Sequence, residues 1–157
     1  MIELTEICKT YKSRSVNTEV LKEVTLTIEK GEFVCLFGRS GSGKTTLLNI
    51  IGLIDTATNG KYYFNSDDVT NLTENQRAIM RNLNIGYIFQ AFHLVAELSV
   101  LDNVTLPMGY AGKSARERKA RGAELLELVG MTHRAKYYPT SLSGGEKQRV
   151  AIARALA

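Results

Sequence analysis

The residues with the plainest chemistry lie in one octapeptide, GRSGSGKT, which runs from Gly38 to Thr45 and matches the phosphate-binding pattern G-x-x-x-x-G-K-[ST]. Its glycines permit backbone angles at which successive N–H groups surround an anion. Lys44 adds a mobile positive charge for the terminal phosphates, and the Thr45 hydroxyl is a suitable ligand for Mg²⁺. The octapeptide therefore predicts a site for a nucleoside triphosphate and Mg²⁺. The residues predicted to line this site are Gly38, Arg39, Ser40, Gly41, Ser42, Gly43, Lys44, Thr45 and Thr46.

A glycine-rich turn that merely contains a lysine is the alternative interpretation of the octapeptide. It is disfavoured because a strand-like run precedes the octapeptide and a helical run follows it, which is the context that the phosphate motif requires. The motif alone does not choose among kinases, GTPases and ATPases.

A second group of residues opens the last sixteen positions, LSGGEKQRVAIARALA. Ser143 and Glu146 form the S-x-x-E pattern of a helix capping box, and a helix N-terminus can also meet a phosphate. A cap alone does not call for Gly144 and Gly145, because helix propensity disfavours glycine at helical positions. Contact with a ligand is therefore preferred, although both interpretations can hold together.

The elements that position the octapeptide alternate between strand and helix. The run EFVCLFG, residues 32–38, is short and almost continuously apolar, which predicts a strand buried on both faces of a parallel sheet. The octapeptide then leads into a helix that stops at Gly52. A second buried strand is predicted at IGYIF, residues 85–89, ending at Gln90.

Three further strands and one further helix are predicted in the first half of the chain. Residues 2–11 and 20–31 alternate apolar with polar side chains, which predicts two antiparallel strands that close with a turn at Lys30 and Gly31. Residues 60–65 predict another strand. Thr73 and Gln76 predict a capping box for a short helix through about Asn82.

Residues 91–140 have mainly helical patterns, which Pro107, Gly109, Gly112 and Pro139 are expected to break. Ser114 with Glu117 caps the clearest helix, which is expected to end at Gly130. Its inward face is Gly122, Leu125, Leu126 and Val129. Its basic residues are Arg116, Arg118, Lys119 and Arg121. Because glutamates are interspersed among them, a solvated face is favoured over a nucleic-acid site.

Composition sets wider limits. The 157 residues carry a formal net charge of +4 and are 44% hydrophobic, which suits one globular domain or part of one. Cys8 and Cys35 lie in strand-like runs without the spacing of a metal site, so we expect small buried side chains in a reducing cytosol. No apolar run approaches the roughly 18 residues that span a bilayer, so a membrane role would come through a partner.

Taken together, these motifs resemble those of the ATP-binding-cassette (ABC) ATPases, and the resemblance covers the whole chain. Leu142 to Glu146 resembles the family's signature motif, Gln90 resembles its glutamine loop, and Tyr11 resembles the aromatic residue that stacks on adenine. Packing near a strand end is the alternative for Tyr11, and a polar strand terminus is the alternative for Gln90. The run from residue 85 to 112 is most similar to the branch that serves lipoprotein release, macrolide export and related systems.

The resemblance implies an α/β fold, a P-loop NTPase of ABC type, in an incomplete domain. Residues 1–90 would form the antiparallel β subdomain and part of the parallel-sheet core, 91–140 the helical subdomain, and 141–157 the signature motif and helix. Lys44 and Gln90 would act in catalysis, with Thr45 and Gln90 at Mg²⁺. The expected ATPase subunit is cytoplasmic, peripheral on the inner face of the membrane, with an integral membrane permease and no nucleic acid as partner.

The resemblance also implies that two nucleotide-binding domains dimerise head to tail. Each would present its signature helix to the ATP of the other, so that Ser143 bonds the γ-phosphate while Gly144 and Gly145 let the backbone approach. The helix N-terminus would add roughly half a positive charge there. Residues 91–107, rich in Phe, Leu and Val, would receive a cytoplasmic helix of the permease, although core packing accounts for much of that apolarity.

The sequence departs from the family after the signature helix. A complete domain would continue into an acidic strand, a catalytic glutamate and a switch histidine, and neither His93 nor His133 has the context of that switch. We therefore expect the 157 residues to bind ATP weakly or transiently without hydrolysing it. We also expect self-association or poor solubility, because the strand at residues 32–38 would keep an open edge.

Three other classes of protein are alternatives to a transporter subunit. DNA-repair and chromosome-maintenance ATPases separate the two motifs by long coiled coils, and no sustained heptads occur here. A translation-associated protein would carry two cassettes in one chain. A fragment that binds nucleotide without turnover is the third alternative.

Overall fold

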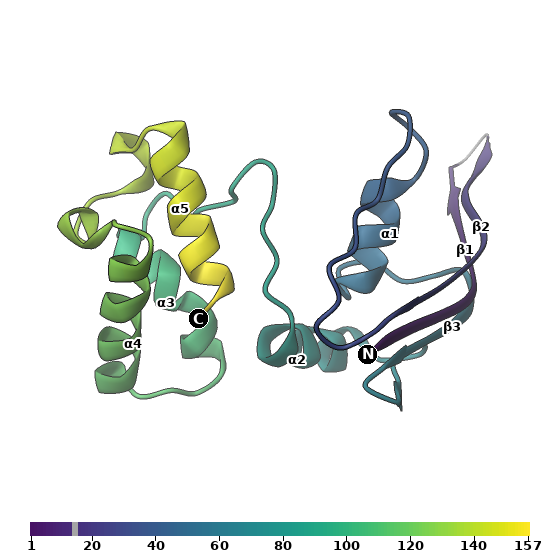
Figure 1. Ribbon diagram of the computed structural model, residues 1–157, viewed down its shortest axis with the longest axis horizontal. Helices are drawn as coiled ribbons and strands as arrows, with labels where there is room; N and C mark the ends of the chain where they lie inside the picture. The colour runs from purple at the N-terminus through teal and green to yellow at the C-terminus, as the bar shows by residue number, and fades with distance from the viewer. Residues whose placement is uncertain (14–15) are drawn as a thin grey trace. The chain divides into compact units, whose positions relative to one another are not determined.

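The computed structural model describes residues 1–13 and 16–157, which form two compact units, Met1–Arg81 and Asn82–Ala157. In Figure 1 the first unit contains the strands and helix α1, and the second contains helices α3, α4 and α5. The predicted division at residues 90 and 140 stays a prediction.

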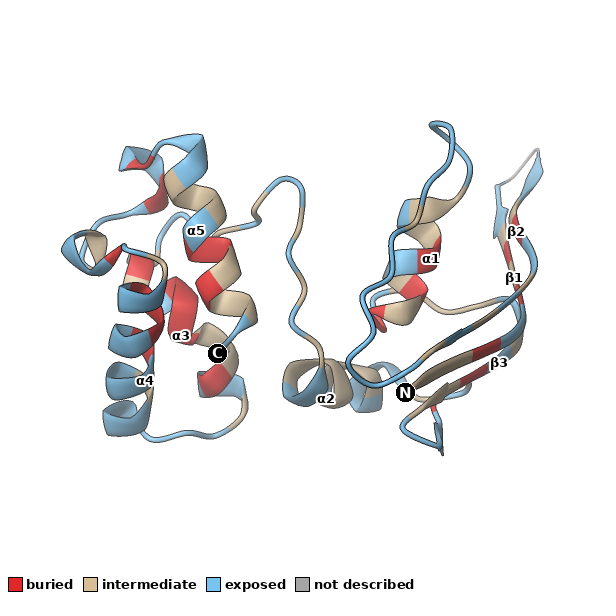
Figure 2. Cartoon of the chain, in the orientation of Figure 1, coloured by how far each residue is buried: buried red, intermediate tan, exposed pale blue. Residues whose placement is uncertain are grey.

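The first unit is built on an antiparallel sheet with the strand order β2-β1-β3-β4. Its strands are β1 (Ile2–Lys12), β2 (Asn17–Ile28), β3 (Asn59–Phe64) and β4 (Asp67–Asp68). Leu4 of β1 lies opposite Leu26 of β2 and Tyr62 of β3. The strands predicted at residues 2–11, 20–31 and 60–65 correspond to β1, β2 and β3, whereas the short β4 was not predicted. Figure 2 shows that each of the longer strands carries both buried and exposed residues.

The two helices predicted in the first half of the chain are both present. Helix α1 (Lys44–Ile51) ends at Gly52 as expected, and its Leu47 and Ile50 are buried. Helix α2 (Glu74–Asn84) begins after Thr73, whose N–H donates to Gln76 Oε1 over 2.9 Å. The Gln76 N–H donates back to Thr73 Oγ1, so the predicted capping box is confirmed.

The two buried parallel strands predicted at residues 32–38 and 85–89 are wrong. Both segments are extended chain without strand pairing within residues 1–13 and 16–157, and Phe33 and Phe37 are 89% and 90% exposed. A strand exists only where a neighbour accepts and donates its backbone hydrogen bonds, so an apolar run without such a neighbour stays open. For the same reason Cys35 is exposed rather than buried.

The second unit is helical. Its helices are α3 (Val100–Tyr110), α4 (Ala115–Leu128) and α5 (Gly144–Ala155), with short 3₁₀ turns η1 (Thr132–Arg134) and η2 (Pro139–Ser141). Ser114 and Glu117 form the predicted capping box of α4. The three helices bury one apolar cluster, which is Val100, Val104, Leu125, Leu126, Met131, Leu142, Val150 and Ala153.

Pro107 and Gly109 do not break a helix, contrary to expectation, because both lie inside α3. A proline removes one N–H donor, and only three residues of α3 follow it. The Pro107 carbonyl still accepts from the Ala111 N–H, so the last turn closes. The predicted stop at Gly112 is correct, since its φ of 74° is in the left-handed region.

Two contacts hold the segment between residues 85 and 99, which contains turns rather than helix. A Cβ built on Gly86 would lie 2.2 Å from the carbonyl oxygen of Ala155, so this backbone touches the end of α5 directly. Asn103, fully buried on α3, accepts from the Val95 N–H over 2.8 Å. Its amide nitrogen donates to three carbonyls over 3.0 Å each, which are those of Val95, Leu98 and Ser99.

Helices of the described residues are too short or too polar to cross a membrane.

Candidate functional site

The glycine loop has the backbone geometry that its glycines are suited to adopt. Gly41 and Gly43 have φ angles of 80° and 87°, in the left-handed region. A Cβ on Gly43 would also lie 2.8 Å from Leu21 Cδ2 and 3.0 Å from the Val20 carbonyl oxygen. Gly43 is therefore fixed both by its backbone angle and by its contact with β2.

The loop ends at a helix whose N-terminus has no internal cap. Among the described residues no side chain caps α1 at Gly43, and its first turn holds no acidic residue. Helices α3, α4 and α5 are capped by serines, which are Ser99, Ser114 and Ser143. The first-turn N–H groups of α1 and the positive end of its dipole are thus presented at the loop, where they suit an anion.

The Lys44 ammonium lies within the loop. It donates to the carbonyl oxygens of Gly38 and Arg39 over 2.9 and 2.7 Å, and to Ser42 Oγ over 3.4 Å. The loop is further closed by the Ser42 N–H, which donates to the Arg39 carbonyl. Thr45, in the first turn of α1, is exposed. Lysine, uncapped amides and an exposed hydroxyl together form a donor set that fits phosphate oxygens and their Mg²⁺.

Tyr11 lies near the end of β1, in the same unit as the loop. Its hydroxyl donates to Asp55 Oδ2 over 2.8 Å, and its side chain is 44% exposed. The hydrogen bond to Asp55 and then burial raise the pKa of Tyr11, and a contact with Thr46 of α1 opposes them. This places the predicted adenine-stacking residue against the helix that follows the loop.

Lys9 and Asp55 are residues of this site that the sequence interpretation missed. Lys9 is 8% exposed, and its ammonium donates to Asp55 Oδ1 over 2.6 Å and lies 4.9 Å from the centre of the Tyr11 ring. A lysine two residues before Tyr11, at an inward position of a strand otherwise apolar on that face, is the one signal that pointed to it. Burial raises the pKa of Asp55, but hydrogen bonds from Lys9, Tyr11 and the Thr56 N–H outweigh burial and leave that pKa below its ordinary value.

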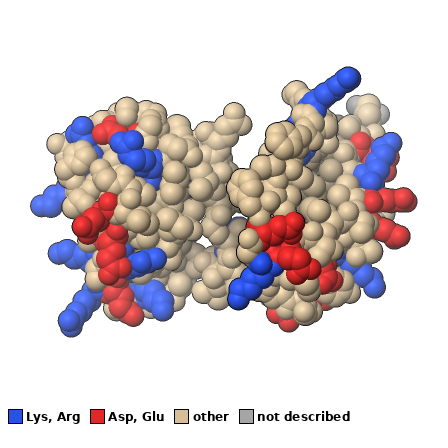
Figure 3. All heavy atoms as spheres, viewed as in Figure 1, with Lys and Arg blue, Asp and Glu red and all other residues tan. Residues whose placement is uncertain are grey.

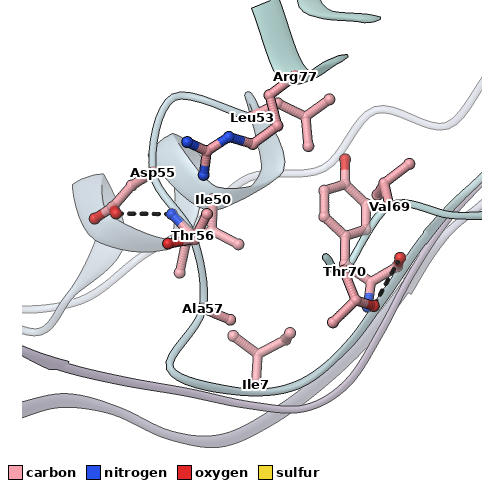
Figure 4. A pocket seen from close by; sticks show the side chains of 10 residues that line it. Ile7, Ile50, Leu53, Asp55, Thr56, Ala57, Val69, Thr70 and Arg77 are labelled. Atoms are coloured by element: carbon pink, nitrogen blue, oxygen red, sulfur yellow. Dashed lines mark hydrogen bonds between the residues drawn. The ribbon is translucent and has the colours of Figure 1, made fainter. Parts of the chain in front are cut away.

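A small cavity lies beside Asp55, lined by residues that include Ile7, Ile50, Thr70 and Arg77, which Figure 4 shows around it. Its volume is about 10 Å³, enough for one water molecule. It cannot hold a nucleotide, so the loop and not this cavity is the candidate site.

The second predicted group, Ser143 to Glu146, forms the start of α5. The Ser143 N–H donates to Glu146 Oε2 over 2.8 Å and the Glu146 N–H donates to Ser143 Oγ over 3.3 Å, so the capping box is confirmed. Arg134 Nε donates to Glu146 Oε1 over 3.1 Å. Hydrogen bonds from the Ser143 backbone and side chain, with Arg134 adding its charge, hold the pKa of Glu146 below its ordinary value.

The two glycines of this helix tip are not needed by the fold of the unit. Neither has a left-handed φ, a Cβ on Gly144 would meet nothing within 4 Å, and a Cβ on Gly145 would only touch Arg149 at 4.0 Å. Ser143, Gly144 and Gly145 are all exposed. Local packing therefore explains the cap and leaves the glycines to be explained by something outside the chain.

Gln90 is exposed in a turn of the second unit, where the Phe92 N–H donates to the Phe89 carbonyl. Phe92 and His93 both have left-handed φ angles, 62° and 47°, and the Arg154 guanidinium donates to their two carbonyl oxygens over 2.6 and 2.5 Å. The His93 ring stacks on Phe89 with 4.6 Å between ring centres. His93 thus has a packing contact with Phe89.

The basic residues of α4 are mixed with acidic ones. Arg121 pairs with Glu124 over 3.3 Å on the surface of the helix. Figure 3 shows basic and acidic side chains side by side over the unit that contains α4. This mixture supports a solvated face rather than a nucleic-acid site.

The structure places the loop and Tyr11 in the first unit, and Gln90 and the tip of α5 in the second. The roles predicted for these residues at a nucleotide and at Mg²⁺ stay predictions.

Comparison with known proteins gives one consistent result. The profile of the family described as "ABC transporter" matches residues 21–157. An uncharacterized ABC transporter ATP-binding protein of Methanocaldococcus jannaschii is 48% identical over 157 residues, which are all of this chain and 70% of that protein. The macrolide export ATP-binding/permease protein MacB of Mannheimia succiniciproducens is 46% identical over 99% of this chain and 24% of its own length.

A solved structure agrees with these relatives. The ATP-binding cassette MJ0796, described as dimeric in a post-hydrolysis state bound to ADP and Pi, superposes with a TM-score of 0.93 at 42% identity. The superposition covers all of this chain and 69% of that one.

Proposed function

The chain belongs to the ABC transporter family of ATPases, and from this premise we propose how its own residues hold ATP and act on a partner. The nucleotide would bind in the glycine loop, with its phosphates on the uncapped N-terminus of α1. That terminus is the observation that carries the proposal, because its donors are left for an external acceptor, whereas α3, α4 and α5 of the second unit are capped by their own serines.

Lys44 and Thr45 at the end of the loop, together with Gln90, would hold the triphosphate and its metal ion. Lys44 would exchange its bonds to the loop carbonyls for bonds to the β- and γ-phosphates. Thr45 would supply one ligand to Mg²⁺, and Gln90 a second together with a role in catalysis. Bound Mg²⁺ supplies neutralisation of the charge that develops on the phosphates.

The tip of α5 would grip the ATP of a second copy. The exposed Gly144 and Gly145 support this, because the chain's own packing does not require glycine there. A dimer would then place Ser143 and the helix N-terminus of one copy against the γ-phosphate of the other, in a head-to-tail arrangement. The dimeric MJ0796 structure is the relevant precedent among similar proteins.

The partner of the pair would be an integral membrane permease, which places the protein at the inner face of the membrane. The combined ATP-binding and permease names of the MacB relatives support this. The permease would contact residues 91–99, where Val95 is partly exposed, rather than Val100 and Val104, which are buried in the chain's own core.

The proposal is tested with Lys44→Met, using Lys61→Met as the matched control, because Lys61 is exposed on β3 of the same unit. Removing a charge-assisted hydrogen bond costs about 1.5–3 kcal/mol, so the affinity for ATP should fall roughly 10- to 150-fold. Titration calorimetry with ATP and Mg²⁺ measures this. Equal affinities of wild type and Lys44→Met, or equal losses in both variants, would contradict the proposal.

A further inference from the structure

One carboxylate connects the aromatic ring of Tyr11 to the helix that follows the glycine loop. Asp55 Oδ2 accepts from the Tyr11 hydroxyl, and Asp55 Oδ1 accepts from the Lys9 ammonium and from the Thr56 N–H over 2.6 and 2.7 Å. Both carboxylate oxygens therefore have partners, of which Lys9 and Tyr11 come from β1 and Thr56 is the next residue in the chain.

Asp55 is itself fixed to α1. Its N–H donates to the Asn49 carbonyl oxygen over 3.1 Å, in the last turns of the helix. Because α1 begins at the loop and Asp55 is bound to its far end, one short rigid element joins the phosphate site to the Tyr11 hydroxyl. The orientation of the ring is thus set relative to the loop.

Lys9 contacts both Asp55 and one face of the Tyr11 ring. Its ammonium also donates to the Thr56 carbonyl oxygen over 2.6 Å, which satisfies a lysine that is otherwise buried. The same ammonium lies 4.9 Å from the ring centre, a cation–π contact that occupies one face of Tyr11. With that face taken and the side chain 44% exposed, a planar base can approach the ring from its open side.

We propose that Asp55 and Lys9 are positioning residues that hold the Tyr11 ring, by its hydroxyl and by one face, in the orientation in which its other face stacks on the adenine of ATP. This inference rests on the proposed function, because it assigns no role unless the loop holds the phosphates. It adds that the hydroxyl of Tyr11, and not only its ring, contributes to affinity.

The test compares ATP with inorganic tripolyphosphate, which has the phosphates and lacks the base. The variants are Tyr11→Phe, which keeps the ring, and Asp55→Asn, with Tyr110→Phe as control because Tyr110 is an exposed tyrosine of the other unit. Immobilising one side chain on binding costs about 0.5–1.5 kcal/mol, so loss of the anchor should weaken ATP binding roughly 2- to 12-fold. Binding of tripolyphosphate should be unchanged in every variant.

The outcomes separate the two proposals. If the wild type binds both ligands and Tyr11→Phe binds ATP as tightly as the wild type, the positioning role is overturned while the proposed function stands. Equal weakening of ATP and tripolyphosphate would also overturn it, because the network would then act through the loop or the fold. Failure of the wild type to bind either ligand would overturn the proposed function itself. Should Asp55→Asn fail to fold, Tyr11→Phe decides, since it keeps the Lys9–Asp55 pair.

Discussion

Replacing Gly144 with alanine separates what the tip of α5 needs for folding from what it needs for contact with a second copy. The position is helical, its φ is not left-handed, and an added Cβ would meet nothing within 4 Å. Alanine at such a site restricts the unfolded chain without straining the folded one. We expect the free energy of unfolding to rise by about 0.4–1 kcal/mol.

The effect on ATP-dependent association should have the opposite sign. A methyl group at the first helical position would stand between the N–H groups of the tip and the phosphate they are proposed to approach. Loss of one charge-assisted hydrogen bond is worth about 1.5–3 kcal/mol, so ATP-driven dimerisation should weaken roughly tenfold or more. Sedimentation equilibrium with ATP and Mg²⁺ measures the association, and urea unfolding measures the stability.

Gly112→Ala is the matched control in the same unit. A Cβ there also meets nothing within 4 Å, but the φ of 74° is left-handed, so this alanine should destabilise the fold by about 1–2 kcal/mol and leave dimerisation alone. If Gly144→Ala dimerised like the wild type, the glycine would not serve contact with a phosphate. If Gly144→Ala lowered the free energy of unfolding, the conclusion that the fold does not need glycine at this helix tip would be wrong.

Two further predictions concern buried polar groups. Asn103→Leu should lower the free energy of unfolding by about 2–5 kcal/mol in urea titrations, because the Val95 N–H and the carbonyls bound by Asn103 would lose their partner. Asn71→Leu is the control, because Asn71 is exposed, and it should change the free energy of unfolding little. Equal effects of the two substitutions would refute a structural role for the Asn103 hydrogen bonds. The pKa of Asp55 is lowered in the folded state, so its stabilisation is complete above the ordinary value of 3.8 and is lost as the pH falls through the folded value. Urea unfolding between pH 7 and pH 2 should therefore show a smaller acid-dependent loss of stability in Asp55→Asn than in the wild type, with the difference confined to pH values below about 4, whereas parallel curves would exclude this contribution.

The parts of the structure that the sequence predicted correctly are those decided by near neighbours in the chain. A serine and a glutamate three residues apart suffice for the caps of α4 and α5, and glycines at fixed spacing suffice for the loop. The alternation in β1 and β2 is equally local. These patterns predict the element and the position of its side chains together.

The errors and omissions involve partners distant in the sequence. An apolar run such as residues 32–38 becomes a strand only if another segment pairs with it, and composition does not name that segment. The link between Tyr11 and Asp55 needs both the register of β1 and the turn after α1, separated by 44 residues. The error at Pro107 is local instead, because a proline near the end of α3 removes one N–H donor and the last turn of the helix still closes.

The contact between Gly86 and the carbonyl of Ala155, the last residue of α5, means that the volume of the side chain decides which residue is tolerated at position 86. Where a methyl group would overlap a carbonyl oxygen, the chain has no second solution that keeps both backbones in place. Codon randomisation at residue 86 followed by selection for a folded product should return glycine almost exclusively, although the residue is exposed and polar substitutions would otherwise be harmless there. Solvent exposure is thus a poor guide to mutational tolerance wherever two main chains touch.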